Sequence, residues 1–146
     1  MSQNIEKILL VEDDPKDVEL TLSALADSNI SNEVVVTRDG TEALDYLYRR
    51  GSFAARADRD PLLILLDLKL PKVDGLQVLN QLKSEDRLKA IPVVMLTSSN
   101  EEKDVVRSYN LGVNAYVVKP VDFDDFAAAI RHLGLFWTLT NRPPRV

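Results

Sequence analysis

The sequence predicts an α/β fold, a doubly wound five-stranded parallel sheet with five helices. Five short apolar runs alternate with segments of helical periodicity along the 146 residues. This alternation indicates parallel strands joined by helical crossovers, with helices on both faces of the sheet. Two of the runs are almost continuously apolar and end in carboxylates, as expected for buried strands that deliver acids to one edge.

The first strand and the first helix occupy residues 8–27. Residues 8–11 are apolar throughout and predict a buried strand. Asp14 is a suitable N-cap residue, and Pro15 suits the first turn of a helix. The apolar positions that follow recur at helical spacing up to Asp27: Val18, Leu22 and Leu25.

A second strand and helix lead into an insert at residues 49–61. Three valines at 34–36 predict the strand, and Asp39-Gly40 turns the chain into the helix. The apolar residues of this helix are Ala43, Leu44 and Leu47. The insert contains four Arg, two Asp and three Ala, and we expect a loop with one extra helical turn.

The third and fourth strands flank another helix. Residues 62–66 are apolar and end at Asp67, and residues 92–96 form the next run, which reaches Thr97. Asp74-Gly75 opens the intervening helix. The apolar residues of that helix are Leu76, Val78, Leu79 and Leu82.

The last third of the chain predicts a strand with one helix before it and one helix after it. Residues 101–110 form a short polar helix that stops at Gly112, a usual helix end. Residues 115–118 form the fifth strand, and Asp122 caps the last helix. The apolar stripe expected to face the core consists of Phe123, Phe126, Ala127, Ile130 and Leu133.

Composition excludes several classes of protein. The chain has no cysteine, which excludes a disulfide framework, a thiolate nucleophile and a zinc–thiolate site. The net charge of −5 gives no support to nucleic-acid binding through a basic surface. The apolar runs are too short to span a bilayer, and the polar residues 1–4 lack a signal-peptide core. We therefore expect a cytoplasmic protein with neither a membrane nor a nucleic-acid partner.

Polar residues stand at the ends of four predicted strands. They are Glu12, Asp13, Asp67, Thr97 and Lys119. Ligands of open parallel sheets bind beyond the carboxyl ends of the strands, so these side chains are expected to share one crevice. Each residue alone has an ordinary explanation as a helix cap, a strand end or a solvated loop residue. Their combination in one crevice favours a functional site.

The residue types in this crevice suit Mg²⁺ and phosphoryl transfer. Mg²⁺ prefers oxygen ligands and is often bound through one or two carboxylates, which Glu12, Asp13 and Asp67 can supply. Phosphoryl transfer requires mainly positioning and positive charge near the transferred oxygens. Lys119 offers a fixed ammonium and Thr97 offers a hydroxyl donor.

The motifs of this crevice resemble those of the receiver domain of two-component response regulators. The matching segments are Val-Glu-Asp-Asp at 11–14, Leu-Asp-Leu-Lys-Leu-Pro at 66–71, Asp-Gly at 74–75, Leu-Thr-Ser at 96–98 and Val-Lys-Pro at 118–120. The resemblance covers nearly the whole chain. It implies a flavodoxin-like sheet with strand order 2-1-3-4-5 and a single receiver domain over residues 1–146, with a core of about 5–133 and a C-terminal extension of about 134–146.

The resemblance also assigns roles to single residues. It implies that Asp67 is the phosphoacceptor, that Asp13 binds Mg²⁺ directly and that Glu12 acts mainly through a bound water. A third protein contact to the metal would be the backbone carbonyl of Lys69. The bond between Lys119 and the proline that follows it would be cis.

By the same resemblance, phosphorylation operates a two-state switch. Thr97 and Lys119 would be drawn toward the phosphoryl group, and Tyr116 would move toward the space that Thr97 leaves. The surface formed by the fourth helix, fifth strand and fifth helix would change and bind an unknown downstream protein. The ordinary alternative for Tyr116 is a core aromatic residue with a hydrated hydroxyl.

The residues after the last predicted helix stripe are expected to form a dimer interface. Leu135, Phe136, Trp137 and Leu139 place apolar groups around the whole helix, and one face cannot bury them all. The alternative is that these side chains fold back onto their own domain. Too few residues follow the fifth strand for a DNA-binding module, so output is expected through protein contacts or onward phosphoryl transfer.

The insert and the Phe-Trp ending resemble a narrower subgroup, the small response regulators of bacterial and cyanobacterial phytochrome histidine kinases. The resemblance implies such a kinase as partner, although the tail 141–144 departs from the apolar ending of that group. The arginines of the insert are either solvated or available to an acidic kinase surface.

Three other functions are weighed against this one. The chain could relay the phosphoryl group to a histidine phosphotransfer protein, act as a Mg²⁺-dependent phosphatase with Asp67 as nucleophile, or serve as a degenerate scaffold. A phosphatase commonly carries a general acid two residues after the nucleophile, where this chain has Lys69. The complete residue set argues against a scaffold. His132, the single histidine, is expected to be a structural or surface residue and not a phosphorelay site.

Overall fold

A computed structural model of the chain describes residues 6–98 and 112–134. Its five strands are all parallel and lie in the order β2-β1-β3-β4-β5, which confirms the expected fold class and strand order. The strands are β1 (Ile8–Val11), β2 (Val34–Thr37), β3 (Leu63–Asp67), β4 (Val93–Thr97) and β5 (Ala115–Val118).

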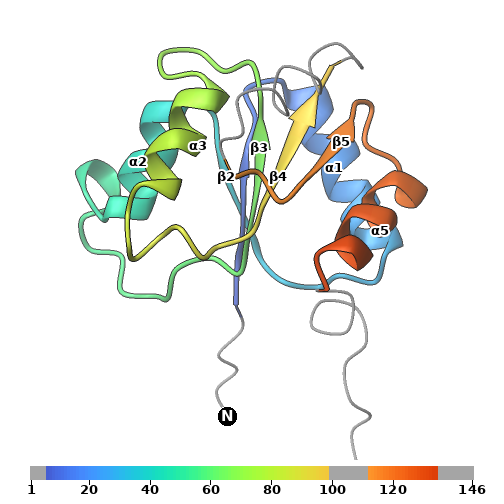
Figure 1. Cartoon of the computed structure of the whole chain (residues 1–146), viewed down its shortest axis with the longest axis horizontal. Coiled ribbons are helices and arrows are strands. Elements are labelled where there is room, and N and C mark those ends of the chain that lie inside the picture. The colour runs from blue at the N-terminus through green and yellow to red at the C-terminus, as the bar shows by residue number, and fades with distance from the viewer. Residues whose placement is uncertain (1–5, 99–111, 135–146) are drawn as a thin grey trace, which may run out of the picture.

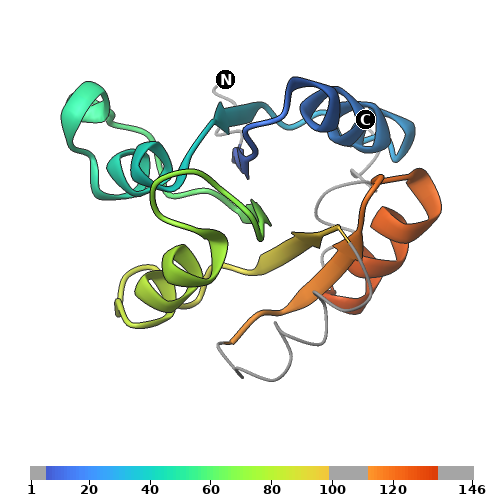
Figure 2. The same ribbon diagram turned by 90° about the horizontal axis from the view of Figure 1, so that it is seen from above.

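Helices cover both faces of the sheet, so the fold has three layers (Figures 1 and 2). α2 (Gly40–Tyr48) and α3 (Gly75–Lys83) lie on one face, and α1 (Pro15–Asp27) and α5 (Phe123–His132) lie on the other. The helix expected at 101–110 lies outside the described residues. No helix within the described ranges is long and apolar enough to cross a membrane.

Each face of the sheet has its own apolar core, because side chains alternate along the strands. On β3, Ile64 and Leu66 pack with α2 and α3, whereas Leu63 and Leu65 pack with α1 and α5. β1, β3 and β4 are buried on both faces, which explains their continuous apolar runs.

Aspartates cap the N-termini of the four α-helices that the structure describes. Asp14 and Asp122 cap α1 and α5, as expected, with their side chains accepting from Lys16 N and Asp125 N. Asp39 caps α2, and Asp74 forms a reciprocal capping box with Gln77 at the start of α3. These caps determine where the chain leaves each strand end and begins the next helix.

The expectation that Phe123 faces the core is wrong, and Leu22, which follows the helical spacing of α1, is also exposed. Leu22 on α1 is 37% exposed and Phe123 on α5 is 44% exposed. On α1 the sheet covers the side that carries Val18, Thr21 and Leu25, which leaves Leu22 at its margin. Phe123 is the first residue of α5, where the helix has only begun to meet the sheet.

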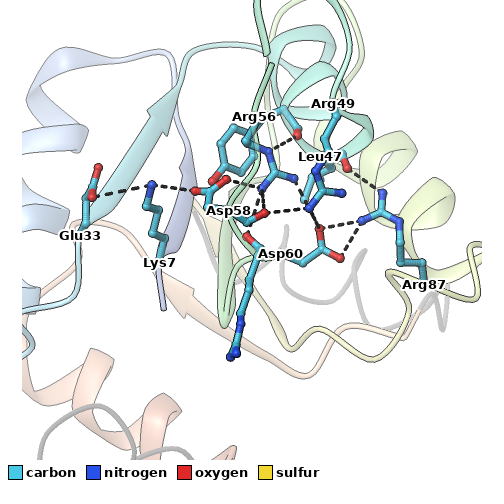
Figure 3. A network of polar contacts seen from close by, with 10 residues as sticks. Lys7, Glu33, Leu47, Arg49, Arg56, Asp58, Asp60 and Arg87 are labelled. Carbon is cyan, nitrogen blue, oxygen red and sulfur yellow. Dashed lines mark hydrogen bonds and ion pairs between the residues drawn. The ribbon is translucent and has the colours of Figure 1, made fainter. Parts of the chain in front are cut away.

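The insert folds against the body of the protein around Arg56 (Figure 3). It contains a short 3₁₀ helix, η1 (Gly51–Phe53), which confirms the extra helical turn. The Arg56 side chain is 6% exposed, and its guanidinium group bonds to the carboxylates of Asp58 and Asp60. Its Nε donates to the Tyr46 carbonyl at 2.9 Å, and the group stacks over the Tyr46 ring. Arg56 is therefore unavailable to a kinase surface.

The acids of the insert connect it to both halves of the fold. Asp58 pairs with Lys7, before β1, at 2.7 Å. Asp60 also accepts two hydrogen bonds from Arg87 at 2.6 and 2.7 Å, and Arg87 donates to the Leu47 carbonyl as well (Figure 3). The insert is thus an ordered part of the domain.

Candidate functional site

Parallel register aligns the polar strand ends at one edge of the sheet. Val11 of β1 pairs with Leu66, so Glu12 follows β1 next to Asp67 at the end of β3. Thr97 pairs with Val118, so Lys119 follows β5 next to the end of β4. The Lys119 backbone N–H extends this pairing by donating to the Thr97 carbonyl at 2.7 Å. The carboxyl ends of the strands lie at the top of Figure 1.

Glu12, Asp13 and Asp67, which we name the acid cluster, come together at this edge. One carboxylate oxygen from each lies within 4.8 Å of the other two. Glu12 is fully buried and Asp67 is 3% exposed, whereas Asp13 is open to solvent. Three carboxylates at this spacing fit a hard divalent cation such as Mg²⁺, and the exposed position of Asp13 leaves access from solvent.

The Lys119 ammonium lies among three carboxylates. Its Nζ is 2.9 Å from Glu12 Oε1, 3.2 Å from Asp67 Oδ1 and 3.0 Å from Asp17 Oδ2. The bond between Lys119 and Pro120 is cis, as the resemblance implied. Lys119 and Asp67 therefore meet directly. Asp17, in the first turn of α1, is a site residue that sequence reasoning missed.

Close approach of α3 holds the backbone of Asp67 in place. A Cβ atom on Gly75 would clash with the Asp67 carbonyl oxygen, so glycine is required at this position. The Gly75 N–H donates to the Leu68 carbonyl at 3.0 Å. The Lys69 N–H donates to Asp67 Oδ1 at 3.3 Å, which folds the turn around the carboxylate.

Thr97 and Tyr116 lie on adjacent strands next to this edge. Thr97 is fully buried, and its Oγ1 has no hydrogen-bond partner among the described residues. Tyr116 pairs with Met95 in the sheet and is half-buried against the core on the α2 and α3 side. Within the part of the chain that the structure describes, the Thr97 hydroxyl therefore has no acceptor, and Tyr116 lies on the neighbouring strand two positions before the residue that pairs with Thr97.

Burial makes the ionised acid cluster unfavourable. It raises the pKa of Glu12 to about 7, although the hydrogen bond with Lys119 acts in the opposite direction. Burial also raises the pKa of Asp67 against the opposing charge of Lys119. For Lys119, burial would lower the pKa, but the hydrogen bonds with Glu12 and Asp17 and the charge of Asp67 outweigh it and raise the pKa. A cation bound among these carboxylates would offset the cost of their charge.

Glu12→Gln should stabilise the cation-free protein at pH 8 by about 1–3 kcal/mol, and much less at pH 5. The native pKa of about 7 lies above the ordinary value of 4.5, so the wild type loses stability as pH rises between these values. The glutamine side chain does not ionise between pH 5 and pH 8, so the variant does not lose stability for this reason. Urea unfolding at both pH values measures the difference, with the exposed Glu19→Gln as control. An equal gain at both pH values would contradict this cause.

The family model described as "Response regulator receiver domain" matches residues 8–131. Among solved structures, the bacteriophytochrome response regulator RtBRR is 64% identical, with a TM-score of 0.89, 96% of this chain covered and 84% of that chain. The phosphorylated cyanobacterial phytochrome response regulator RcpA is 44% identical, with a TM-score of 0.73 and coverage of 96% and 99%.

A curated relative is the response regulator Rcp1 of Synechocystis sp. (strain ATCC 27184 / PCC 6803 / Kazusa). It is 42% identical over 94% of this chain and 92% of its own length. The Mn²⁺-bound form of Rcp1 has a TM-score of 0.72 with this fold, at 39% identity and with coverage of 97% and 99%. This chain, which carries the acid cluster and Lys119 at its sheet edge, is therefore similar to phytochrome response regulators over almost its full length.

Proposed function

Because this chain belongs to the response regulator receiver family, we propose that it accepts a phosphoryl group on Asp67 from a sensor histidine kinase. The observation that carries the proposal is the position of the Asp67 carboxylate, 3.2 Å from the Lys119 ammonium and within the acid cluster. In this reading the chain is a signalling protein, and phosphorylation of Asp67 controls its contacts with an unknown downstream protein.

The transfer converts the Asp67 carboxylate into an acyl phosphate. An Asp67 carboxylate oxygen attacks the phosphorus of a phosphohistidine, and the new O–P bond forms as the N–P bond breaks. The electron pair of the broken bond returns to the imidazole nitrogen of the kinase. Lys119, already at hydrogen-bond distance from Asp67, then pairs with a phosphoryl oxygen and offsets its charge.

Glu12, Asp13 and Asp67 would hold Mg²⁺, with the backbone carbonyl of Lys69 as a further ligand. The support is the donor set of the acid cluster, and the related Rcp1 has a Mn²⁺-bound form. When bound, Mg²⁺ supplies positive charge that neutralises the carboxylates and the oxygens of the transferred group. The chain itself contributes the fixed spacing of the three carboxylates and the exclusion of bulk water from Glu12 and Asp67.

Thr97 and Tyr116 would report the phosphorylated state. Thr97 Oγ1 is buried and has no partner among residues 6–98 and 112–134, so a phosphoryl oxygen on Asp67 gives its hydroxyl an acceptor. Movement of Thr97 toward that oxygen leaves space for the half-buried Tyr116 ring. The signal then reaches β5 and α5, where a protein partner binds.

A phytochrome histidine kinase is the proposed phosphodonor, in the cytoplasm. The support is the 64% identity to the bacteriophytochrome response regulator RtBRR over 96% of this chain. We further propose a homodimer through Leu135, Phe136, Trp137 and Leu139, which lie outside the described residues. Sedimentation of the full chain with and without phosphodonor tests whether this dimer exists and whether it depends on phosphorylation.

Incubation with acetyl phosphate and Mg²⁺ should increase the mass of the chain by one phosphoryl group. Chelation of Mg²⁺ should abolish the increase, because the single charge of Lys119 would then face both the acid cluster and the phosphoryl oxygens. Peptide mapping after reduction of the acyl phosphate with borohydride should place the group at Asp67. An unchanged mass at saturating phosphodonor, or a group attached elsewhere, would refute the proposed function.

A further inference from the structure

Asp17 differs from the other two carboxylates around Lys119 because it does not belong to the acid cluster. Its Oδ2 accepts a hydrogen bond from Lys119 Nζ at 3.0 Å. The Asp17 side chain is 26% exposed and lies in the first turn of α1, whereas Glu12 and Asp67 lie at strand ends. A cation held by the acid cluster would contact Glu12 and Asp67, which also contact Lys119. It would not contact Asp17.

An ordinary helix-stabilising role does not account for the position of the Asp17 side chain. Acidic residues in a first turn interact favourably with the helix dipole, and Asp17 does so by its place in the sequence. The N-terminus of α1 is capped by Asp14, whose side chain accepts from Lys16 N at 2.9 Å. The Asp14 N–H is directed to Glu12 Oε2 at 3.3 Å. The carboxylate of Asp17 is therefore free of capping contacts and bonds to Lys119, 102 residues away.

We propose that Asp17 is a positioning residue that competes with the phosphoryl group for Lys119 and thereby slows the phosphorylation of Asp67. This inference rests on the proposed function. An ammonium group has three N–H donors, and three carboxylate oxygens surround that of Lys119 at 2.9–3.2 Å. Among these contacts the one with Asp17 is a hydrogen bond, so an incoming phosphoryl oxygen must compete with Asp17 for the Lys119 ammonium.

Asp17 is the strongest of the three competitors once a divalent cation is bound. The cation withdraws negative charge from Glu12 and Asp67 and weakens their attraction for Lys119, while that of Asp17 is unchanged. Asp17 also adds a negative charge next to the path of an anionic phosphodonor. Both effects act in the same direction, so loss of the Asp17 charge should speed phosphoryl uptake.

Asp17→Asn tests this inference, because it keeps the size and an acceptor oxygen but removes the charge. With acetyl phosphate and Mg²⁺, its initial rate of phosphorylation should be roughly two- to fivefold higher than that of the wild type. The matched control is Glu19→Gln, which removes the same charge from an exposed position on the same helix. The rate advantage over Glu19→Gln should persist at 0.5 M salt, where long-range repulsion between the protein and the anionic donor is screened.

Three further measurements separate the possible outcomes. In a Lys119→Gln background, Asp17→Asn should give no increase, because Asp17 acts through Lys119. If Asp17 only stabilises α1, Asp17→Asn will unfold at a lower urea concentration than the wild type but will be phosphorylated at the rate of Glu19→Gln. Asp17→Ser will then show the same two results. That result overturns this inference and leaves the proposed function intact. Absence of phosphorylation in the wild type would instead refute the proposed function.

Discussion

Asp67→Asn should take up no phosphoryl group from acetyl phosphate and Mg²⁺, and the cation-free protein should become more stable to urea at pH 8. The amide has no anionic oxygen to attack phosphorus, so phosphorylation is lost completely. The stability gain follows from burial, which raises the pKa of Asp67 and makes its charge costly at neutral pH. Mass spectrometry and urea unfolding measure the two effects.

The sign of the stability change depends on pH. The native pKa of Asp67 is raised above its ordinary value of 3.8, so the wild type loses stability as pH rises through the raised native value. The gain from asparagine is therefore present at pH 8 and absent at low pH. Saturating Mg²⁺ should stabilise the wild type more than the variant, because the variant lacks one carboxylate of the acid cluster.

Asp86→Asn is the matched control, since the Asp86 side chain is 97% exposed and lies outside the site. It should be phosphorylated at the wild-type rate and keep wild-type stability within about 0.5 kcal/mol. Phosphoryl uptake by Asp67→Asn would remove Asp67 as the acceptor. Destabilisation of that variant at pH 8 would show that pairing with Lys119 outweighs the cost of burial.

Arg56→Met should lower the free energy of unfolding by about 3 kcal/mol, the second large effect. Methionine retains part of the apolar packing against Tyr46 but loses every hydrogen bond of the guanidinium group. The carbonyls of Tyr46, Asp58 and Arg59 lose a donor, as do the carboxylates of Asp58 and Asp60. Urea unfolding followed by circular dichroism measures the loss.

Arg56→Lys keeps the charge but not the planar fork, so it should recover less than half of this loss. Arg59→Met is the control, because Arg59 is an exposed arginine of the same insert. Its expected change is below about 0.5 kcal/mol. The folded fraction of Arg56→Met should still be phosphorylated, since the insert lies apart from the acid cluster. A change of less than 1 kcal/mol in Arg56→Met would show that Lys7 and Arg87 satisfy the insert acids without it.

Local sequence patterns were sufficient to predict the strands, the helix starts and the acidic residues of the site. Residues 8–11 and 62–66 are apolar throughout because both faces of their strands are buried. Asp14 and Asp122 act as caps through contacts with residues two or three positions away, which depend little on the rest of the fold. The position of Asp67 at a strand end follows from the end of its apolar run.

Helix periodicity alone was not sufficient to identify which side chains are covered. Leu22 and Phe123 fit the apolar stripes of α1 and α5, yet both are exposed. The period shows that a helix has an apolar side, but the limits of the covered area depend on the neighbouring strands and helices. The same holds for the arginines of the insert, whose composition cannot distinguish a solvated loop from the buried Arg56 network.

The sequence by itself determined the fold class, the strand order through its resemblance to receivers, and the identity of the acids and the lysine at the sheet edge. Tertiary structure alone decided that Lys119 shares its ammonium with Asp17, and that Arg56 is buried between Asp58, Asp60 and Tyr46. The physical reason is the separation along the sequence of the residues that interact. Strand burial and helix capping involve neighbours along the chain, whereas an ion pair forms between any two side chains that packing brings within about 4 Å.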